Sequence, residues 1–540
     1  MNLGMFLNNN ISYKAYKAVV EDPYFVDKSE LLAELFPLIG RKNRYVCITR
    51  PRRFGKTVMA NMVGAFFGKT ADTNLFDGLA VSQSKAYEQY LNKYDVVYID
   101  FSRAPELCVS YQAYITRIID GLKRDLWDAF PDLEVDRSKS IWDIMQEVNE
   151  KTNTTFIFVM DEWDAVFHMH FITEEDRKEY LLFLKYLLKD QPYVELAYMT
   201  GVLPIAKYSS GSELNMFAEY NMVEAEKFSM YFGFCDTEVD KLYQVYKETT
   251  KCPRFGREDL RIWYDGYYTA VGERLYNPRS IVLALTDNQL RNYWTSSGPY
   301  DEIFYYIRNN VDAVRDDLAL MAAGERVAAD IGQYAASSME IDSREQIYSA
   351  MVVYGLLTYA DGEVFIPNKE LMDQFNEMLL SKDSLGYVYQ LARKSEQMLQ
   401  ATLAGDTKTM EEILQFARDT ESPILSYNNE AELSAAVNLC YLSARNRYRV
   451  EREEKAGKGF VDFIFYPVRR NNDCLILELK VDDTPERAIQ QIKDKKYAYR
   501  FQGKLGENPK YTGRILAVGI SYQKKTKEHR CKIEVLNISG

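Results

Sequence analysis

The stretch from Tyr45 to Thr57, which reads YVCITRPRRFGKT, constrains the fold more strongly than any other part of the chain. Its apolar first half predicts a buried strand, and its last residues, Gly-Lys-Thr, are typical of a phosphate-binding loop that leads into a helix. In such a loop the backbone N–H groups of the first helical turn bind the anion. We therefore expect Gly55, Lys56 and Thr57 to contact ATP, with Lys56 at the terminal phosphates and Thr57 on Mg²⁺.

Three arginines distinguish this loop from the common pattern G-x-x-x-x-G-K-[ST], because Arg50 stands where that pattern has its first glycine. A guanidinium group binds phosphate through two N–H groups at once. Arg50, Arg52 and Arg53 are therefore candidates to replace the missing glycine or to sense the nucleotide. Pairing with surface carboxylates is the alternative, and the residues themselves favour neither interpretation.

Three further apolar runs follow the loop, at residues 94–102, 156–162 and 194–201, and stretches with helical periodicity separate them. Strands that alternate with helices predict an α/β fold with a mostly parallel sheet between two helical layers. The first third of the chain is thus expected to be a P-loop NTPase domain with a three-layer parallel sheet.

Acidic residues follow directly after the apolar run FIFVM, at Asp161 and Glu162. We expect Asp161 to hold Mg²⁺ from the end of a strand beside the loop strand, and Glu162 to act as the base that orients the attacking water. A strand that ends at a solvated acidic turn is the alternative, and the phosphate-loop pattern earlier in the chain favours the metal site. Thr200, at the end of the next strand, is either a contact to the γ-phosphate or a plain strand-end threonine.

The middle of the chain has a different pattern, because from about residue 231 the alternation of strands gives way to aromatic-rich helical stretches. A helix from Arg344 to Leu357 leads into a hairpin signal at Asp361-Gly362. A helix followed by a hairpin predicts a winged-helix unit. Such units bind DNA or serve as structural adaptors, and the acidic residues at the hairpin tip favour the adaptor.

The second chemically informative region is a pair of β-prone runs, at residues 461–467 and 474–480, which predict an antiparallel hairpin. If the turn centres near Asn471, Asp462 lies opposite Lys480 and close to Glu478. Such a group suits phosphodiester hydrolysis. The two carboxylates bind a divalent metal that activates a water, and the lysine stabilises the charge that develops on the phosphate.

Helices on both sides of this hairpin add candidates. The upstream helix, residues 430–443, offers Glu430 or Glu432 as a further carboxylate, and the downstream helix places Gln491 and Lys495 on one face. The alternative is an ordinary surface hairpin, because Glu-x-Lys alone is a common tripeptide. The combination of Asp462 with the flanking glutamates and Gln491 favours the catalytic interpretation.

Composition limits the classes of function. The net charge of −12 argues against a protein that coats nucleic acid non-specifically, although it leaves room for a local basic groove. Seven cysteines without C-x-x-C spacing favour reduced thiols in a cytosol. Neither a signal-peptide pattern nor a run of about 18 apolar residues occurs, so we expect a cytoplasmic protein without membrane contact. A chain of 540 residues also exceeds a single hydrophobic core.

Several segments together carry a family resemblance: YFVDKSELL, ITRPRRFGKT, FVMDEWD, TGVLPIAK, WYDGYY, NPRSI, GFVDFIFYP, LILELKVDD and AIQQIKDKKYA. On these segments the chain resembles the bacterial AAA-ATPase-like proteins whose C-terminal part is a PD-(D/E)XK-type nuclease domain. That family carries RPRRFGK at its loop, so Arg50 departs only from the wider NTPase pattern.

The resemblance implies roles for matching residues. It implies nucleotide contacts at Gly55, Lys56 and Thr57, completed by Asp161 and Glu162. In the nuclease-like part it implies a catalytic group that Gln491 and one glutamate of the preceding helix support, and we choose Glu430 for that glutamate. The group itself consists of Asp462, Glu478 and Lys480.

The sequence therefore predicts four parts. These are an AAA-ATPase-like NTP-binding domain (1–230), a helical lid or adaptor (231–335), a winged-helix-like segment with a helical connector (336–420), and a restriction-endonuclease-like α/β domain (421–540).

The expected function is ATP binding and hydrolysis, with Mg²⁺, coupled to a metal-dependent nuclease domain that acts on DNA or RNA. The alternative is an NTP-controlled switch or binding module whose nuclease-like domain no longer cleaves and instead binds nucleic acid or protein. Assembly into a homo-oligomer stays open, because NTPases of this kind form rings or dimers but no residue here decides the matter.

Overall fold

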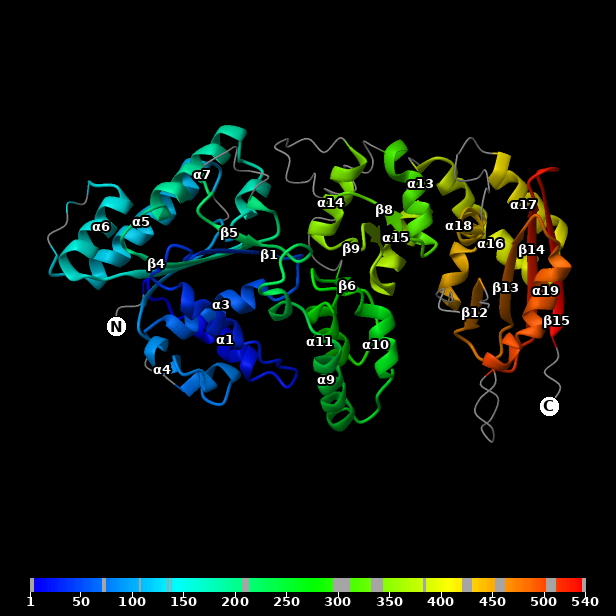
Figure 1. The fold of residues 1–540 in the computed structure, drawn as a ribbon, viewed down its shortest axis with the longest axis horizontal. Coiled ribbons are helices and arrows are strands. Elements are labelled where there is room, and N and C mark those ends of the chain that lie inside the picture. The colour runs from blue at the N-terminus through cyan, green and yellow to red at the C-terminus, as the bar shows by residue number, and fades with distance from the viewer. Residues whose placement is uncertain are drawn as a thin grey trace.

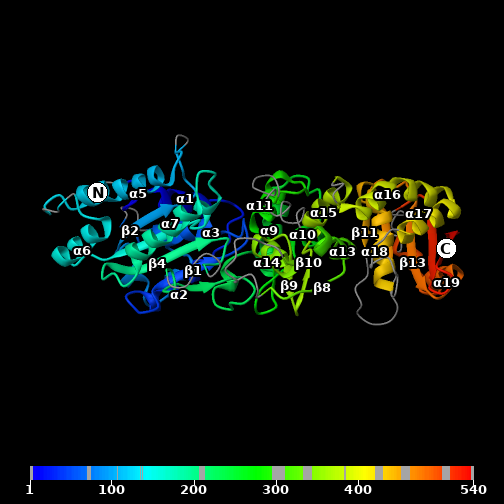
Figure 2. The ribbon, with the colours of Figure 1, turned by 90° about the horizontal axis from the view of Figure 1, so that it is seen from above.

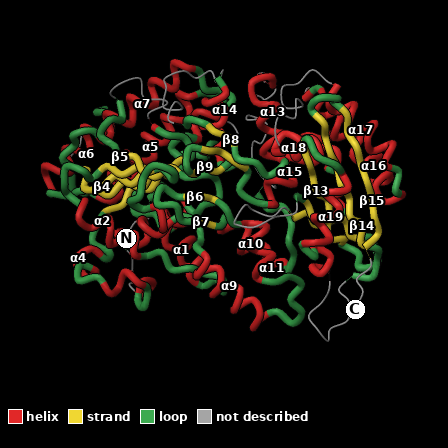
Figure 3. Tube along the Cα trace, turned by 45° about the vertical axis from the view of Figure 1, so that its right-hand side comes forward, coloured by secondary structure: helices red, strands yellow, loops and turns green. Residues whose placement is uncertain are grey.

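The computed structural model describes residues 4–69, 74–105, 108–133, 136, 138–205, 213–294, 311–331, 343–381, 385–419, 430–451, 462–501 and 511–536. Three regions follow one another in chain order along the long axis of the molecule, and the view from above shows the same succession (Figures 1 and 2). Helices and strands alternate in the first region, helices dominate the second, and a sheet with long strands forms the third (Figure 3).

The first region is built on a parallel sheet with the strand order β2-β3-β4-β1-β5. Its strands are β1 (Tyr45–Thr49), β2 (Asp95–Asp100), β3 (Phe156–Asp161), β4 (Val194–Gly201) and β5 (Ala218–Tyr220). The parallel α/β sheet predicted from the alternating pattern is confirmed. The expectation that the Asp161 strand lies beside the loop strand is wrong, because β4 pairs with both and separates them.

Two hydrophobic clusters cover the two faces of this sheet, because side chains alternate along each strand. On β1, Val46 and Ile48 pack in one cluster and Cys47 packs in the other. One face carries α1 (Ile11–Val20), α2 (Glu30–Leu35) and α3 (Lys56–Phe67), and the other carries α5 (Tyr111–Ala129), α6 (Ile141–Thr152) and α7 (Glu174–Leu188) (Figure 1). Parallel strands end at a common edge, so the loops after β1, β3 and β4 meet there.

The middle region is mainly helical, as predicted. Its helices are α9 (Asp236–Thr249), α10 (Arg257–Tyr264), α11 (Pro278–Asp287), α13 (Val311–Ala322), α14 (Arg344–Tyr354) and α15 (Lys369–Ser381). Short strands accompany them, namely β6 (Tyr267–Tyr268), β7 (Arg274–Leu275), β8 (Val327–Ala328), β9 (Thr358–Ala360) and β10 (Glu363–Phe365). Strands β9 and β10 pair around Asp361 and Gly362, whose φ angles of 54° and 82° close the expected hairpin turn.

The last region is a mixed sheet with the order β11-β12-β13-β14-β15. The strands are β11 (Tyr448–Glu451), β12 (Phe463–Pro467), β13 (Cys474–Val481), β14 (Ile515–Gln523) and β15 (Glu528–Leu536). One face packs against α16 (Tyr387–Ala404), α17 (Thr407–Asp419) and α18 (Glu430–Cys440), and the other against α19 (Pro485–Asp494).

The hairpin of β12 and β13 forms, but with another register than expected. Phe463 pairs with Leu477 and Phe465 with Leu475, so the register continues to place Asp462 across from Glu478 rather than from Lys480. The reason is the turn: the N–H of Asn472 donates to the carbonyl of Arg469 at 3.0 Å, which centres the connection near residue 470.

One continuous hydrophobic cluster joins the second and third regions. It begins at Phe54 in the loop after β1, includes Tyr267 and Phe375, and reaches Leu477 and Tyr522 in the last sheet. The middle helices therefore share a core with the last sheet and also contact the loop.

Candidate functional site

The predicted phosphate loop joins a buried strand to a helix. Strand β1 ends at Thr49 and α3 begins at Lys56. Gly55 caps the helix with a φ of 87°, a left-handed conformation that favours glycine over residues with a β-carbon. The first turn of α3 thus opens at the carboxyl edge of the sheet with its N–H groups unused by the helix, which is the arrangement that binds anions.

Lys56 lies inside the loop rather than in solvent, with 4% of its surface exposed. Its Nζ donates to the carbonyl of Arg50 at 3.1 Å and to that of Pro51 at 3.2 Å. These two neutral acceptors hold the ammonium above the start of the helix.

The environment of Arg50 matches neither a contact to the nucleotide nor a pair with a surface carboxylate. The side chain is 1% exposed, and its guanidinium donates to the carbonyls of Thr49 (2.8 Å), Tyr220 (2.6 Å) and Phe228 (3.3 Å). It also lies over the ring of Phe232 at 5.0 Å, and burial lowers its pKa to about 9. Arg50 thus ties β1 to β5 and to the segment after it, and these three hydrogen bonds are to carbonyls rather than to surface carboxylates.

Arg53 points in another direction, into the middle region. Its backbone has a φ of 72°, which is strained for a residue with a side chain, and its guanidinium donates to the carbonyl of Tyr293. Burial, together with the neighbouring cations Arg279 and Arg52, lowers the pKa of Arg53, while Glu370 opposes this shift. Arg52 itself is half-buried in the same loop.

Asp161 ends β3 and is almost fully buried, with 1% exposed. The hydroxyl of Thr200, on the intervening strand β4, donates to its Oδ1, while Oδ2 is buried and has no hydrogen-bond partner within the described ranges. Burial raises the pKa of Asp161 to about 6, and the hydroxyls of Thr200 and Thr57 oppose that shift. Thr57 of α3 therefore lies near the end of β3.

A Mg²⁺ ion fits this arrangement. Magnesium prefers oxygen ligands, and it is usually held by one or two protein groups together with water and phosphate oxygens. Thr57 offers a hydroxyl and Asp161 offers a buried carboxylate oxygen that lacks another partner in the described structure. An unpaired buried carboxylate oxygen is costly, and a cation would remove that cost.

Glu162 and Asp164 follow Asp161 on the same edge. Glu162 is half-buried and has a φ of 53°, a strained conformation of the kind found at functional sites. The sequence interpretation missed Asp164, whose Oδ2 accepts hydrogen bonds from the N–H groups of Val202 (3.1 Å) and Leu203 (2.8 Å). The sequence feature that could have pointed to it is the second aspartate of the motif DEWD, residues 161–164.

Asp164 is 2% exposed, and burial raises its pKa, while Lys56 is one of the cations that oppose the shift. A β-carbon on Gly201 would lie 2.3 Å from the ring of Trp163, so the end of β4 needs glycine to approach the DEWD turn. The end of β4 and this acidic turn are thereby brought together.

The second predicted site lies on the sheet of the last region. Asp462, Glu478 and Lys480 share the face that α19 covers, because Ile464 and Ile476 at alternate positions pack with α19. Lys480 Nζ donates to Glu478 Oε1 at 2.8 Å, and Asp462 Oδ2 accepts from the N–H of Leu479 at 2.7 Å. Glu478 is 1% exposed.

Tyr497 is a further residue at this second site that the sequence interpretation missed. It lies in a short helical turn after α19 and is 5% exposed. Burial, with the charges of Glu478 and Asp462, raises its pKa to about 12. The sequence feature that could have pointed to Tyr497 is its position, six residues after Gln491. Gln491 itself is half-buried on α19.

Glu430 is the first residue of α18, and its side chain lies outside the described part of the structure. Within the described ranges no group of three or more His, Cys, Asp and Glu residues could hold a metal ion. Asp462 and Glu478, the two carboxylates predicted on the hairpin, both lie within the described part of the structure.

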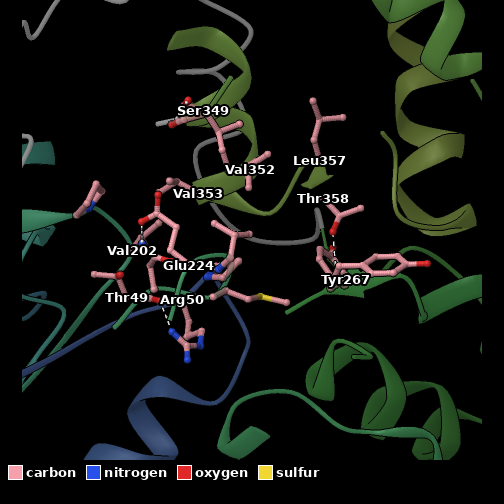
Figure 4. A pocket seen from close by; sticks show the side chains of 17 residues that line it. Thr49, Arg50, Val202, Glu224, Tyr267, Ser349, Val352, Val353, Leu357 and Thr358 are labelled. Atoms are coloured by element: carbon pink, nitrogen blue, oxygen red, sulfur yellow. Dashed lines mark hydrogen bonds between the residues drawn. The ribbon is translucent and has the colours of Figure 1, made fainter. Parts of the chain in front are cut away.

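A separate cavity of about 100 Å³ lies between the first and middle regions (Figure 4). Thr49 and Arg50 border it on one side, and Val352, Leu357 and Thr358 border it on the other. None of Gly55, Lys56, Thr57 and Asp161 lines it, so this mostly apolar space is distinct from the phosphate loop. Among the described helices none is both long and apolar enough to cross a membrane.

Comparison with protein families gives two matches on separate segments. Residues 11–210 match the family described as predicted AAA-ATPase, and residues 429–530 match the PD-(D/E)XK nuclease superfamily. The first segment contains the phosphate loop and the DEWD turn. The second contains the sheet that carries Asp462, Glu478 and Lys480.

Individual proteins match more distantly. A protein of Azotobacter chroococcum from the vnfD 5′ region is 23% identical over 515 residues, which cover 90% of this chain and 91% of that protein. The Walker-type ATPase of Pyrococcus abyssi is 13% identical with a TM-score of 0.37, covering 64% of this chain and 94% of the other. The ORC2 protein of Aeropyrum pernix is 11% identical with a TM-score of 0.34, covering 72% and 95%.

Proposed function

We propose that this chain, which joins an AAA-ATPase-like domain to a PD-(D/E)XK nuclease-superfamily domain, binds and hydrolyses ATP. Its nucleotide state then controls a metal-dependent nuclease that acts on DNA or RNA. The proposal includes four domains, with boundaries at residues 230, 335 and 420. A cytosolic location also belongs to it, since all seven cysteines are free.

The observation that carries the ATPase half is the convergence of Lys56, Thr57 and Asp161 at one sheet edge. Lys56 is held over the first turn of α3, and Thr57 and Asp161 present oxygen ligands next to it. A nucleotide phosphate would exchange two neutral carbonyls on Lys56 for a stronger charge-assisted contact. Gly55 allows the backbone to approach the phosphates. Arg52 and Arg53 of the same loop are assigned to the nucleotide as well, although the guanidinium of Arg53 donates to the carbonyl of Tyr293 in this structure.

Hydrolysis needs a group that orients water against the terminal phosphate. Glu162 directly follows the Mg²⁺ carboxylate Asp161 and is partly open to solvent, so it is the residue we assign to this role. Bound Mg²⁺ would neutralise charge that develops on the phosphates. The chain itself positions Glu162 through the strained turn after β3 and the hydrogen bonds of Asp164.

The nuclease half rests on Asp462, Glu478 and Lys480, which lie on one face of the last sheet. Asp462 and Glu478 would hold a divalent metal that supplies a nucleophilic water, and Lys480 would face the phosphate. Gln491 and Glu430 are assigned supporting roles from the flanking helices. Lys and Arg outnumber Asp and Glu by 16 to 10 over residues 462–536, so this part is basic within an acidic chain, as a nucleic-acid contact requires.

A second candidate is a nuclease-like domain that binds without cleaving. It is favoured by the ion pair of Lys480 with Glu478, which occupies one carboxylate with an ammonium. In that case the nucleotide-dependent part would act as a switch on nucleic acid or protein binding.

One preparation tests both halves. ATP hydrolysis and cleavage of single- and double-stranded DNA and RNA are measured with Mg²⁺ and with Mn²⁺, for the parent, Asp161→Asn and Asp462→Ala. We expect Asp161→Asn to abolish hydrolysis and Asp462→Ala to abolish cleavage while leaving hydrolysis intact. Cleavage that persists in Asp462→Ala would point to a contaminant, and parent protein that binds nucleic acid without cutting it would favour the second candidate. The mass of the protein in solution, with and without ATP, tests for a homo-oligomer.

A further inference from the structure

Glu370, in the first turn of α15, is a buried carboxylate that lies at the junction of three segments of the middle region. It has 0% exposure. Its two oxygens accept from Ser280 Oγ at 3.0 and 2.9 Å, and Oε1 also accepts from the N–H groups of Tyr293 (2.6 Å) and Trp294 (2.8 Å). One carboxylate therefore holds α11, α15 and the segment 293–294 together.

The same segment contacts the phosphate loop. The carbonyl of Tyr293 accepts from the guanidinium of Arg53, and the N–H of Trp294 donates to Glu370. That carbonyl and that N–H belong to a single peptide group, so this group is held at one end by a loop arginine and at the other by a buried carboxylate. Hydrogen bonds in such a chain polarise and strengthen one another.

Electrostatics links the two ends as well. Glu370 is among the groups that favour the charged form of Arg53, and Arg53 in turn favours the ionised form of Glu370. Other charged or titratable groups nearby are Arg279, at the start of α11, and Tyr264 of α10. A buried carboxylate is stable only while donors and a counter-charge remain in place.

Apolar contacts bind the loop to the same region. The ring of Phe54 lies 4.9 Å from that of Tyr267 in an edge-to-face arrangement, and the Tyr267 hydroxyl donates to the carbonyl of Gly355 at 3.1 Å. A β-carbon on Gly355 would lie 2.7 Å from the Cβ of Pro51. The loop is therefore packed against the middle region on both sides of Arg53.

We propose that Glu370 is a positioning residue for the phosphate loop. Through the peptide group between Tyr293 and Trp294 it fixes Arg53 beside the nucleotide, and through Ser280 it conveys the state of the loop to α11 and α15. The proposal rests on the proposed nucleotide binding and adds a residue more than 300 positions away from the loop. Because coupling between two sites is reciprocal, nucleotide binding must also change the environment of Glu370.

A double-mutant cycle tests the link. The affinity for Mg²⁺ and a non-hydrolysable ATP analogue is measured for the parent, Arg53→Gln, Glu370→Gln and the double variant. We expect each single substitution to weaken binding about tenfold, the size of one charge-assisted hydrogen bond, and the double variant to be no weaker than about the worse single one. Glu377→Gln, an exposed glutamate on the same helix, is the matched control and should bind as the parent does.

If Glu370 only stabilises the fold, the double-mutant cycle gives another result. Effects that multiply in the double variant, or unchanged affinity in Glu370→Gln, would overturn the proposal while leaving nucleotide binding by the parent intact. A parent that binds no nucleotide removes the proposed function and this inference together.

Amide hydrogen exchange covers the case in which Glu370→Gln does not fold. In the parent, saturating nucleotide should slow exchange in the peptide that contains Tyr293 and Trp294, and Arg53→Gln should lose that response. The same response in Arg53→Gln and in the parent would contradict the proposed path.

Discussion

The phosphate loop and the carboxylate face of the last sheet differ in how their charges are satisfied. At the phosphate loop and the neighbouring DEWD turn, charged side chains are held by backbone groups: Lys56 by two carbonyls and Asp164 by two N–H groups. On the last sheet, Lys480 is held by the carboxylate of Glu478. A site whose charges rest on neutral backbone is ready for a charged ligand, whereas a site closed by an internal ion pair must first exchange a partner.

This comparison predicts a nucleotide site at which the phosphate displaces only neutral partners of Lys56, and a metal site at which the cation competes with the ammonium of Lys480. The buried Oδ2 of Asp161, which has no hydrogen-bond partner in the described structure, points the same way.

The largest effect is expected from Lys56→Ala. Removal of the ammonium should weaken ATP binding about 100-fold and slow hydrolysis about a thousandfold, because a charge-assisted contact to the terminal phosphates is lost. Isothermal titration and steady-state ATPase rates measure both values. The exposed Lys42→Ala is the control. Binding at parental strength would show that Lys56 stays on its two carbonyls in the complex.

Arg50→Met should destabilise the folded chain rather than the complex. Three carbonyls lose their donor in a buried position, which costs about 3 kcal/mol of unfolding free energy. Denaturant unfolding measures this loss, and the exposed Arg41→Met should show little of it. Nucleotide affinity of the folded variant should stay close to that of the parent. A tenfold loss of affinity would instead return Arg50 to the nucleotide contacts.

We expect the unfolding free energy of the chain to depend on pH through the ionisation of Glu370. Burial raises its pKa in the folded state from 4.5 to about 7. Between these values the folded chain keeps a proton that the unfolded chain releases, so its contribution is complete below about pH 4.5 and is lost as pH rises through about 7. The loss is about 3 kcal/mol, from 1.36 kcal/mol per pKa unit.

The measurement is the unfolding free energy of the parent and of Glu370→Gln from about pH 5 to pH 8. The parent should lose stability relative to the variant as pH rises. The groups that face Glu370 are Arg53, Ser280 and Tyr264, and the exposed Glu377→Gln should run parallel to the parent. A difference that does not change with pH would mean that Glu370 ionises normally in the folded chain.

The smallest effect is expected from Lys480→Gln. With the ammonium gone, Glu478 Oε1 loses its ion-pair partner Lys480, so Mn²⁺ affinity at the last sheet should rise about tenfold while cleavage falls. Titration calorimetry with Mn²⁺ in the Asp161→Asn background, which lacks the metal carboxylate of the first site, isolates this site. Lys525→Gln is an exposed control. Unchanged or weaker Mn²⁺ binding would remove the competition that distinguishes the two sites.

Local features of both sites were accessible from the sequence. The strand, the loop and the helix around Gly55, Lys56 and Thr57 are consecutive, so residue types alone predicted their order. The alternation of residues on β13 likewise placed Glu478 and Lys480 on one face. Roles that depend on distant chain segments were not accessible, and Arg50, Asp164 and Tyr497 are the examples.

The sequence by itself thus determined the parallel α/β domain, its phosphate loop, the DE turn and the hairpin of the last sheet, because each depends on neighbouring residues and their periodicity. Only the tertiary structure decided that β4 separates β1 from β3, that Asp462 faces Glu478, and that Glu370 and Arg53 hold one peptide group from opposite ends. The physical reason is that strand order, register and buried polar networks arise from contacts between segments far apart in the chain, and short-range patterns carry no record of which segments meet.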